Sequence, residues 1–235
     1  MRIKLSHKVS VFFSIGFIFL VNSCTIYEPQ IVSIPLMCEK NEVQLNGGFS
    51  ILGGVYGSAA YAPGNHVALQ IYGAAYPDNS NFQGTIGFYT KNKSAQNFEV
   101  YAGYGNGKGT EYTDSNNQHV YSNADYSLYF LQANFGQTNM GSAHIDYGFG
   151  IKTGIFDVTV KDDLFTTSTP YQNSALLIEP QAFVRMGSEK FKVGFQMNGT
   201  KIFINRDVDL SYEFYYPFNV GISLNFRIAP SLNQK

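Results

Sequence analysis

The sequence predicts an all-β protein: an antiparallel, up-and-down transmembrane β-barrel of about ten strands, with eight strands as the alternative count. Three observations lead to this prediction. Apolar and polar residues alternate with a period of two along most of the chain, which is typical of strands. Aromatic residues make up 16% of the chain, and strands favour Tyr and Phe. Charged residues make up only 14%, too few to cover the wet surface of a soluble β domain.

The chain begins with a candidate export signal over residues 1–23. Arg2, Lys4 and Lys8 precede an uncharged apolar stretch over 9–21. This stretch is shorter than the ~20 residues that a membrane-spanning helix needs, and it fits the apolar region of a signal peptide. An ordinary signal peptide is the alternative to the lipoprotein signal considered next.

The end of that signal resembles the cleavage site of bacterial lipoproteins. The residues are Val21-Asn22-Ser23-Cys24, in which only Asn22 is unusual. The resemblance implies that Cys24 becomes the acylated first residue of the mature protein. No acidic run follows Cys24, which favours an anchor in the periplasmic leaflet. Cys38 is then left without a partner, so we expect no intramolecular disulfide.

Residues 24–41 are predicted to be a lipidated tether, because they contain two prolines and show no period. The barrel follows over 42–228, and 229–235 form a C-terminal tail. The clearest strand is the last, where apolar residues occupy every second position from Tyr212 to Phe226. The predicted strands are 42–50, 54–62, 66–76, 82–91, 97–106, 121–136, 143–159, 174–187, 190–201 and 211–226.

The predicted connections differ between the two ends of the barrel. Those at 63–65, 92–96, 137–142 and 188–189 are mostly short. Most of the others are longer and more polar, and 107–120, 160–173 and 202–210 are candidate surfaces for an extracellular ligand. Short periplasmic turns and long outer loops are typical of outer-membrane barrels. An even strand count also returns the C-terminus to the periplasm.

Alternation alone does not show which face of the strands meets lipid. A lipocalin-like soluble barrel places its apolar residues inside, whereas a membrane barrel places them outside. The polar face here carries few charged residues, which suits a narrow lumen in which acids and bases can pair. These charged residues include Glu99, Asp146, Lys152, Glu179, Arg185 and Lys192. This favours the membrane barrel. Candidates for its aromatic girdles are Tyr61, Tyr104, Tyr126, Tyr147, Phe183, Phe214 and Phe226.

No motif indicates catalysis, a cofactor or a metal site. Ser142 and His144 are close in sequence, but they lie near a predicted turn and no orienting acid accompanies them. His119 and the pair Asp162–Asp163 lie in polar predicted loops. The glycines at 105, 107 and 109 are not followed by a helix, so they do not form a phosphate loop. A net charge of −1 gives no electrostatic basis for binding nucleic acid.

Several segments resemble a family of largely uncharacterised Bacteroidetes outer-membrane β-barrel lipoproteins. They are the proline-bearing linker after Cys24 with the segment 35–43, residues 59–62 with 65–67, and residues 98–105. Cys38 departs from the family pattern. The resemblance implies an outer-membrane location and a barrel fold, and it adds no activity.

The sequence leaves several functions open. The first hypothesis is a non-enzymatic barrel with a structural or surface-interaction role, in contact with outer-membrane lipid. The second is a narrow channel for small solutes. A soluble lipid-binding barrel and an enzyme that acts on outer-membrane lipid are the remaining alternatives.

Overall fold

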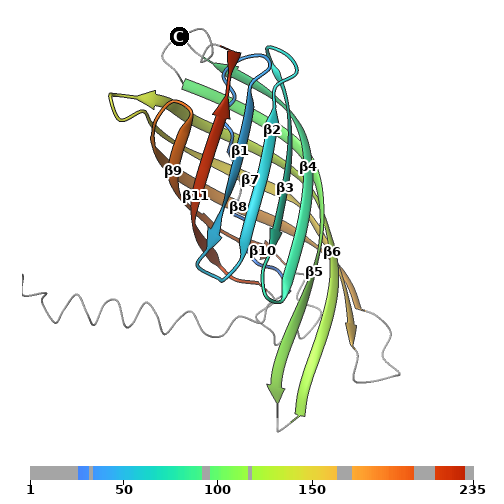
Figure 1. The fold of residues 1–235 in the computed structure, drawn as a ribbon. Helices are drawn as coiled ribbons and strands as arrows, with labels where there is room; N and C mark the ends of the chain where they lie inside the picture. Colours follow the sequence, from blue (N-terminus) through green and yellow to red (C-terminus); the bar gives the residue numbers. More distant parts are fainter. Residues whose placement is uncertain are drawn as a thin grey trace, which may run out of the picture.

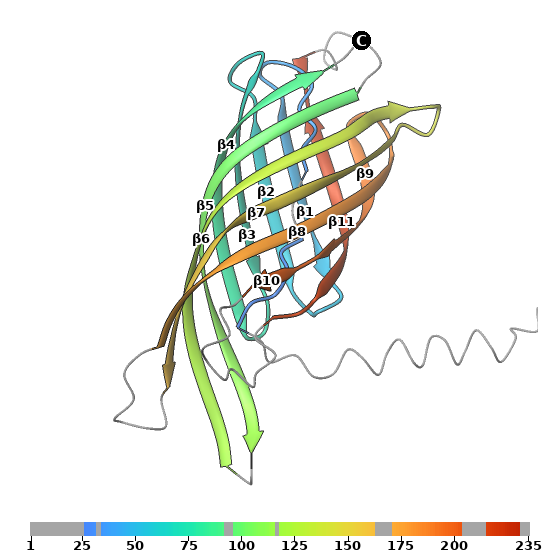
Figure 2. The same cartoon turned by 180° about the vertical axis from the view of Figure 1, so that it is seen from behind.

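The chain forms a closed antiparallel β-barrel in the computed structural model, which describes residues 26–31, 34–91, 96–115, 118–162, 171–203 and 215–230 (Figures 1 and 2). Neighbours in sequence pair with each other from β1 to β8, and β11 closes the ring by pairing with both β1 and β9. The strands are β1 Val43–Ser50, β2 Val55–Tyr61, β3 Val67–Ala75, β4 Asn79–Lys91, β5 Gln96–Ser115, β6 Gln118–Met140, β7 Ile145–Asp162, β8 Tyr171–Gly187, β9 Phe191–Gly199, β10 Lys201–Phe203 and β11 Phe218–Ile228.

The wall of the barrel is ten strands wide. β9 and β10 are separated only by Thr200, and both pair with β8, so they count as one strand of the wall. The predicted count of ten is confirmed, and the alternative count of eight is wrong.

The apolar face of the strands points outward. On β3, Val67, Leu69 and Ile71 are exposed, whereas Ala68 and Gln70 between them are buried. The same alternation runs along β9 and β11. A soluble barrel has the reverse arrangement, so the lipocalin-like alternative is wrong for this chain. The described strands instead carry an apolar outer belt of the kind that faces lipid.

The predicted aromatic girdles are correct only in part. Tyr61, Tyr104, Tyr147 and Phe226 point outward and are exposed. Two other candidates, Tyr126 and Phe183, point into the lumen, where they are 4% and 7% exposed. Phe214 lies outside the described residues.

The two rims of the barrel differ. At one rim lie the C-terminal end of β11 and the connections β2–β3, β4–β5, β6–β7 and β8–β9; we call it the short-turn rim (Figure 1). At the opposite rim the β5–β6 hairpin extends well beyond the barrel wall (Figures 1 and 2). We call this the long-hairpin rim.

The prediction of long loops is wrong in part, because strands occupy many of the residues assigned to them. β5 and β6 include 107–115 and 118–120, β7 and β8 include 160–162 and 171–173, and β10 includes 202–203. These residues carry no alternation of apolar and polar side chains in the sequence, so the pattern did not predict them as strands. The last strand begins at Phe218 and not at 211, and 211–214 lie outside the described residues.

Among the described residues, no helix is long and apolar enough to cross a membrane.

Candidate functional site: the barrel lumen

The predicted tether lies inside the barrel. Residues 26–31 and 34–38, which we call the strap, run through the lumen from the long-hairpin rim to the start of β1 at the short-turn rim. From Ile26 to Met37, every described strap residue is buried, and Tyr27 and Met37 are 0% exposed. The sequence predicted an irregular, proline-containing tether here and did not predict that it lies in the lumen.

The strap is held at the long-hairpin rim by contacts on several sides. The Asn79 side chain at the start of β4 donates a hydrogen bond to the Ile26 carbonyl at 2.5 Å. Tyr27 forms a β-bridge with Tyr215, just before β11. The Tyr27 hydroxyl donates to Glu179 on β8 at 2.8 Å, and its ring packs edge-on against Phe156 on β7.

Further along the lumen, two wall asparagines hold the strap backbone. The side chain of Asn219 on β11 donates to the Pro29 carbonyl at 2.8 Å, and that of Asn198 on β9 donates to the Gln30 carbonyl at 2.5 Å. Proline has no N–H and cannot extend a strand ladder, so these side-chain amides take the place of a neighbouring strand.

Wall side chains hold the strap in the same way towards the short-turn rim. There the wall side chains bond to both carbonyl and N–H groups of the strap backbone, and an arginine, an asparagine and a glutamate each make one of these bonds. The bonds are Arg185 to the Ile34 carbonyl at 2.7 Å, Asn97 to the Leu36 carbonyl at 2.9 Å, and the Met37 N–H to Glu99 at 2.7 Å. A buried backbone group without a hydrogen-bond partner costs folding free energy. These bonds therefore stabilise this particular segment inside the lumen.

Three wall glycines leave room for the strap. A Cβ atom at Gly109 would overlap the backbone of Ile26, and one at Gly221 would overlap the side chain of Ile31. At Gly136 a Cβ atom would lie 2.7 Å from the side chain of Leu36. Since backbone yields less easily than the end of a side chain, Gly109 is the most demanding of the three positions.

Gly109→Ala should therefore destabilise the barrel by about 1–3 kcal/mol, the usual cost of overpacking. The measurement is urea unfolding of the full-length protein in lipid vesicles. Gly84→Ala on β4 is the matched control, because a Cβ atom there would meet nothing within 4 Å. Equal stability of the two variants would contradict the placement of the strap against β5.

Acidic and basic side chains pair inside the lumen, which confirms the prediction for Lys152, Glu179, Lys192 and Asp146, whereas Glu99 and Arg185 bind the strap backbone. Lys152 lies 2.7 Å from Glu179, and both side chains are 0% exposed. Lys192 lies 2.5 Å from Asp146, and Arg227 lies 2.6 Å from Glu42 near the start of β1. The Lys152 ammonium also donates to the side chain of Gln30, so the strap shares in this ion pair.

The space left beside the strap is small near the short-turn rim. A gap of about 20 Å³ lies among Asp146, Arg185, Lys192 and Arg227. A water molecule needs roughly 10–15 Å³ measured in this way, so the gap holds about one.

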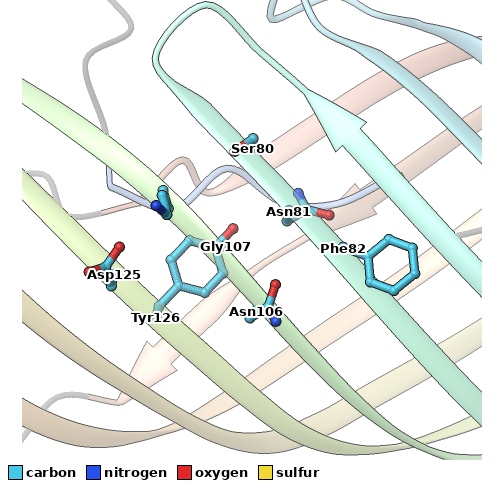
Figure 3. A pocket seen from close by; sticks show the side chains of 8 residues that line it. Ser80, Asn81, Phe82, Asn106, Gly107, Asp125 and Tyr126 are labelled. Atoms are coloured by element: carbon cyan, nitrogen blue, oxygen red, sulfur yellow. The ribbon is translucent and has the colours of Figure 1, made fainter.

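A larger hollow of about 420 Å³ lies where the β5–β6 hairpin leaves the barrel (Figure 3). Four of its eight lining residues are exposed, whereas Asn81 and Tyr126 are buried, so the hollow lies in the wall itself, between the outer surface and the lumen. Phe82 is its apolar wall, and Lys108 and Asp125 lie on the polar side. The hollow therefore marks the edge of the apolar belt. Its lining residues are Ser80, Asn81, Phe82, Asn106, Gly107, Lys108, Asp125 and Tyr126.

Ser142 and His144 lie in the β6–β7 turn, where the His144 N–H donates to the Gly141 carbonyl. A further histidine, His66, stacks on Phe88 and has Nδ1 3.2 Å from the Tyr89 carbonyl. His119 and Asp162 lie within strands and not in loops, which is a correction.

The predicted lipidation site Cys24 lies outside the described residues, as does Asp163, the second residue of the acidic pair. Cys38 is half-buried and accepts a hydrogen bond from Asn97. Within the described ranges, no group of three or more His, Cys, Asp or Glu side chains could hold a metal ion.

No protein-family model and no curated protein matches the chain. Among solved structures, the chain is similar to the N-terminal β-barrel domain of Pseudomonas aeruginosa OprF. The two share 11% identity with a TM-score of 0.33, over 80% of this chain and 98% of that chain. The strand pairings and the burial pattern define the class of protein: a closed antiparallel barrel with an apolar outer belt and an occupied lumen.

Proposed function

We propose that this chain is an outer-membrane lipoprotein barrel with a closed lumen, and that its role is structural or one of surface interaction. The observation that carries the proposal is the strap. Wall side chains on β4, β5, β8, β9 and β11 bond to its backbone along the whole lumen. A transport path would need that space to be open.

The apolar belt supports placement in a membrane. Large apolar side chains are exposed all around the described wall, for example Phe49 at 70%, Ile86 at 58% and Ile222 at 59%. In water such a continuous apolar surface would be an aggregation liability. In a bilayer it is the stable arrangement, because the closed ring satisfies the backbone hydrogen bonds.

The long-hairpin rim is the part suited to contacts outside the cell. There β5 and β6 extend past the belt as a hairpin. Lys161 on the neighbouring strand β7 pairs with Asp125 on β6 at 2.7 Å. The corresponding predicted ligand surfaces, 107–120, 160–173 and 202–210, remain candidates. Lipidation at Cys24, kinship with the Bacteroidetes barrel lipoproteins and the lack of catalysis remain predictions of the sequence.

Planar-bilayer recordings test the closed lumen. Pure, refolded full-length protein should show no discrete openings, because the strap and the wall side chains fill the lumen. A variant lacking residues 26–35 should conduct under the same conditions. Discrete openings of the full-length protein that this deletion leaves unchanged would favour the channel hypothesis instead.

A further inference from the structure

We propose that the chain upstream of Ile26 leaves the barrel at the long-hairpin rim, so that a lipid on Cys24 lies in the outer leaflet, on the side of the β5–β6 hairpin. This inference rests on the proposed lipoprotein function for the lipid itself. The direction of the strap rests on described contacts alone.

The upstream end of the strap lies at the long-hairpin rim. Ile26 accepts a hydrogen bond from Asn79, the first residue of β4. Gly109, which faces the Ile26 backbone, pairs with Asn79 in the wall. The Tyr216 N–H, just before β11, donates to the Tyr27 carbonyl at 3.3 Å. Contacts from β4, β5 and the segment before β11 therefore fix Ile26 and Tyr27 at the same rim.

The downstream end of the strap lies at the other rim. The Cys38 N–H donates to Glu42 at 2.8 Å, and Cys38 contacts Thr138 near the end of β6. β1 begins at Val43, which pairs with Ile228 at the end of β11. The strap therefore crosses the whole lumen before the first strand begins.

Chain length decides where Cys24 can lie. It is two residues upstream of Ile26, and an extended chain covers at most about 7 Å in two residues. The apolar belt of such a barrel is about 25 Å tall. An acyl group on Cys24 consequently reaches the leaflet at the long-hairpin rim and not the one at the short-turn rim.

The rims identify the leaflets. Outer-membrane barrels place their short turns in the periplasm and their longer connections outside. The C-terminal end of β11 lies at the short-turn rim, so the long-hairpin rim is the outer one. The lack of an acidic run after Cys24 favoured the periplasmic leaflet; the direction of the strap favours the opposite leaflet.

Epitope accessibility in intact cells tests the proposal with the full-length chain. One short epitope is inserted between Thr25 and Ile26, the same epitope between Asn116 and Asn117 at the hairpin tip, and the same epitope after Lys235. Antibody should label the first two in intact cells as strongly as in permeabilised cells. The third should be labelled only after the outer membrane is permeabilised.

The proposal is overturned if the epitope at Thr25 needs permeabilisation while the hairpin epitope does not. Heat-dependent gel mobility shows that each tagged barrel is folded. If the insertion prevents folding, Thr25→Lys with a membrane-impermeant amine reagent repeats the test, with the label located on residue 25 by peptide mass spectrometry because Lys161 also reacts.

Metabolic labelling with an acyl probe separates this proposal from the lipoprotein function. The wild-type chain should carry the label, and Cys24→Ser should lose it while still entering the detergent phase through its barrel. An unlabelled wild type would overturn lipidation, and with it the leaflet assignment, while the epitopes would still report the side on which the strap begins.

Discussion

Replacing Lys152 with methionine should destabilise the folded barrel by about 3–5 kcal/mol, the usual cost of leaving a buried charge without its partner. The Glu179 carboxylate would remain, 0% exposed, and its hydrogen-bond donors among the described residues would be the hydroxyls of Tyr27 and Thr200. Tyr27 belongs to the strap, so the loss should reach the lumen contacts as well as the wall. Urea unfolding in lipid vesicles measures it.

Two further variants show whether the effect comes from burial of the charge. Lys161→Met removes a lysine whose side chain is 57% exposed and pairs with Asp125, so it should cost less than about 1 kcal/mol. The double variant Lys152→Met/Glu179→Gln should recover much of the stability, because no unpaired charge then remains. A Lys152→Met barrel as stable as Lys161→Met would contradict the buried pair.

Ile222→Arg should cost about 2–4 kcal/mol in a bilayer, the penalty for a cation near the midplane on the lipid-facing side of a barrel. Ile222 lies in the middle of β11, and its partners Phe49 and Phe195 on either side also point outward. Folding equilibria in lipid vesicles give the free energy directly.

Phe218→Arg is the matched control, on the same face of the same strand. Phe218 is the first residue of β11, close to the rim, where the penalty falls to about 0–1 kcal/mol. If both substitutions were equally harmless, the outer belt would not be facing lipid.

The wall of the barrel was predictable because lipid imposes a simple pattern. Residues such as Val193, Phe195 and Met197 face outward at every second position, and Lys192, Gln196 and Asn198 between them face the lumen. The sparse charges on the polar face were recognised as internal pairs for the same reason. A water-exposed wall would have needed more of them.

The occupant of the lumen could not be predicted, because it carries no periodic pattern. Pro29 and Pro35 interrupt any alternation, and the residues that hold the strap, such as Asn79, Asn198 and Asn219, look like ordinary inward-facing polar residues. Tyr126 was assigned to a girdle although it packs on Tyr27 in the lumen. An aromatic residue suits both the lipid-facing and the lumen-facing side of a strand, so its type does not show which side it takes. One available signal was the apolar content of the presumed linker, with Ile26, Ile31, Ile34 and Leu36.

The strap also constrains the order of assembly. Its two ends emerge at opposite rims of a closed ring, and the bonds from the wall come from strands as late in the chain as β11. The lipid that we propose at Cys24 could not be drawn afterwards through a lumen filled by these contacts. The ring must therefore close around a segment that is already in place. The last pair of strands to form hydrogen bonds would then fix the rim at which the N-terminal end of the strap lies.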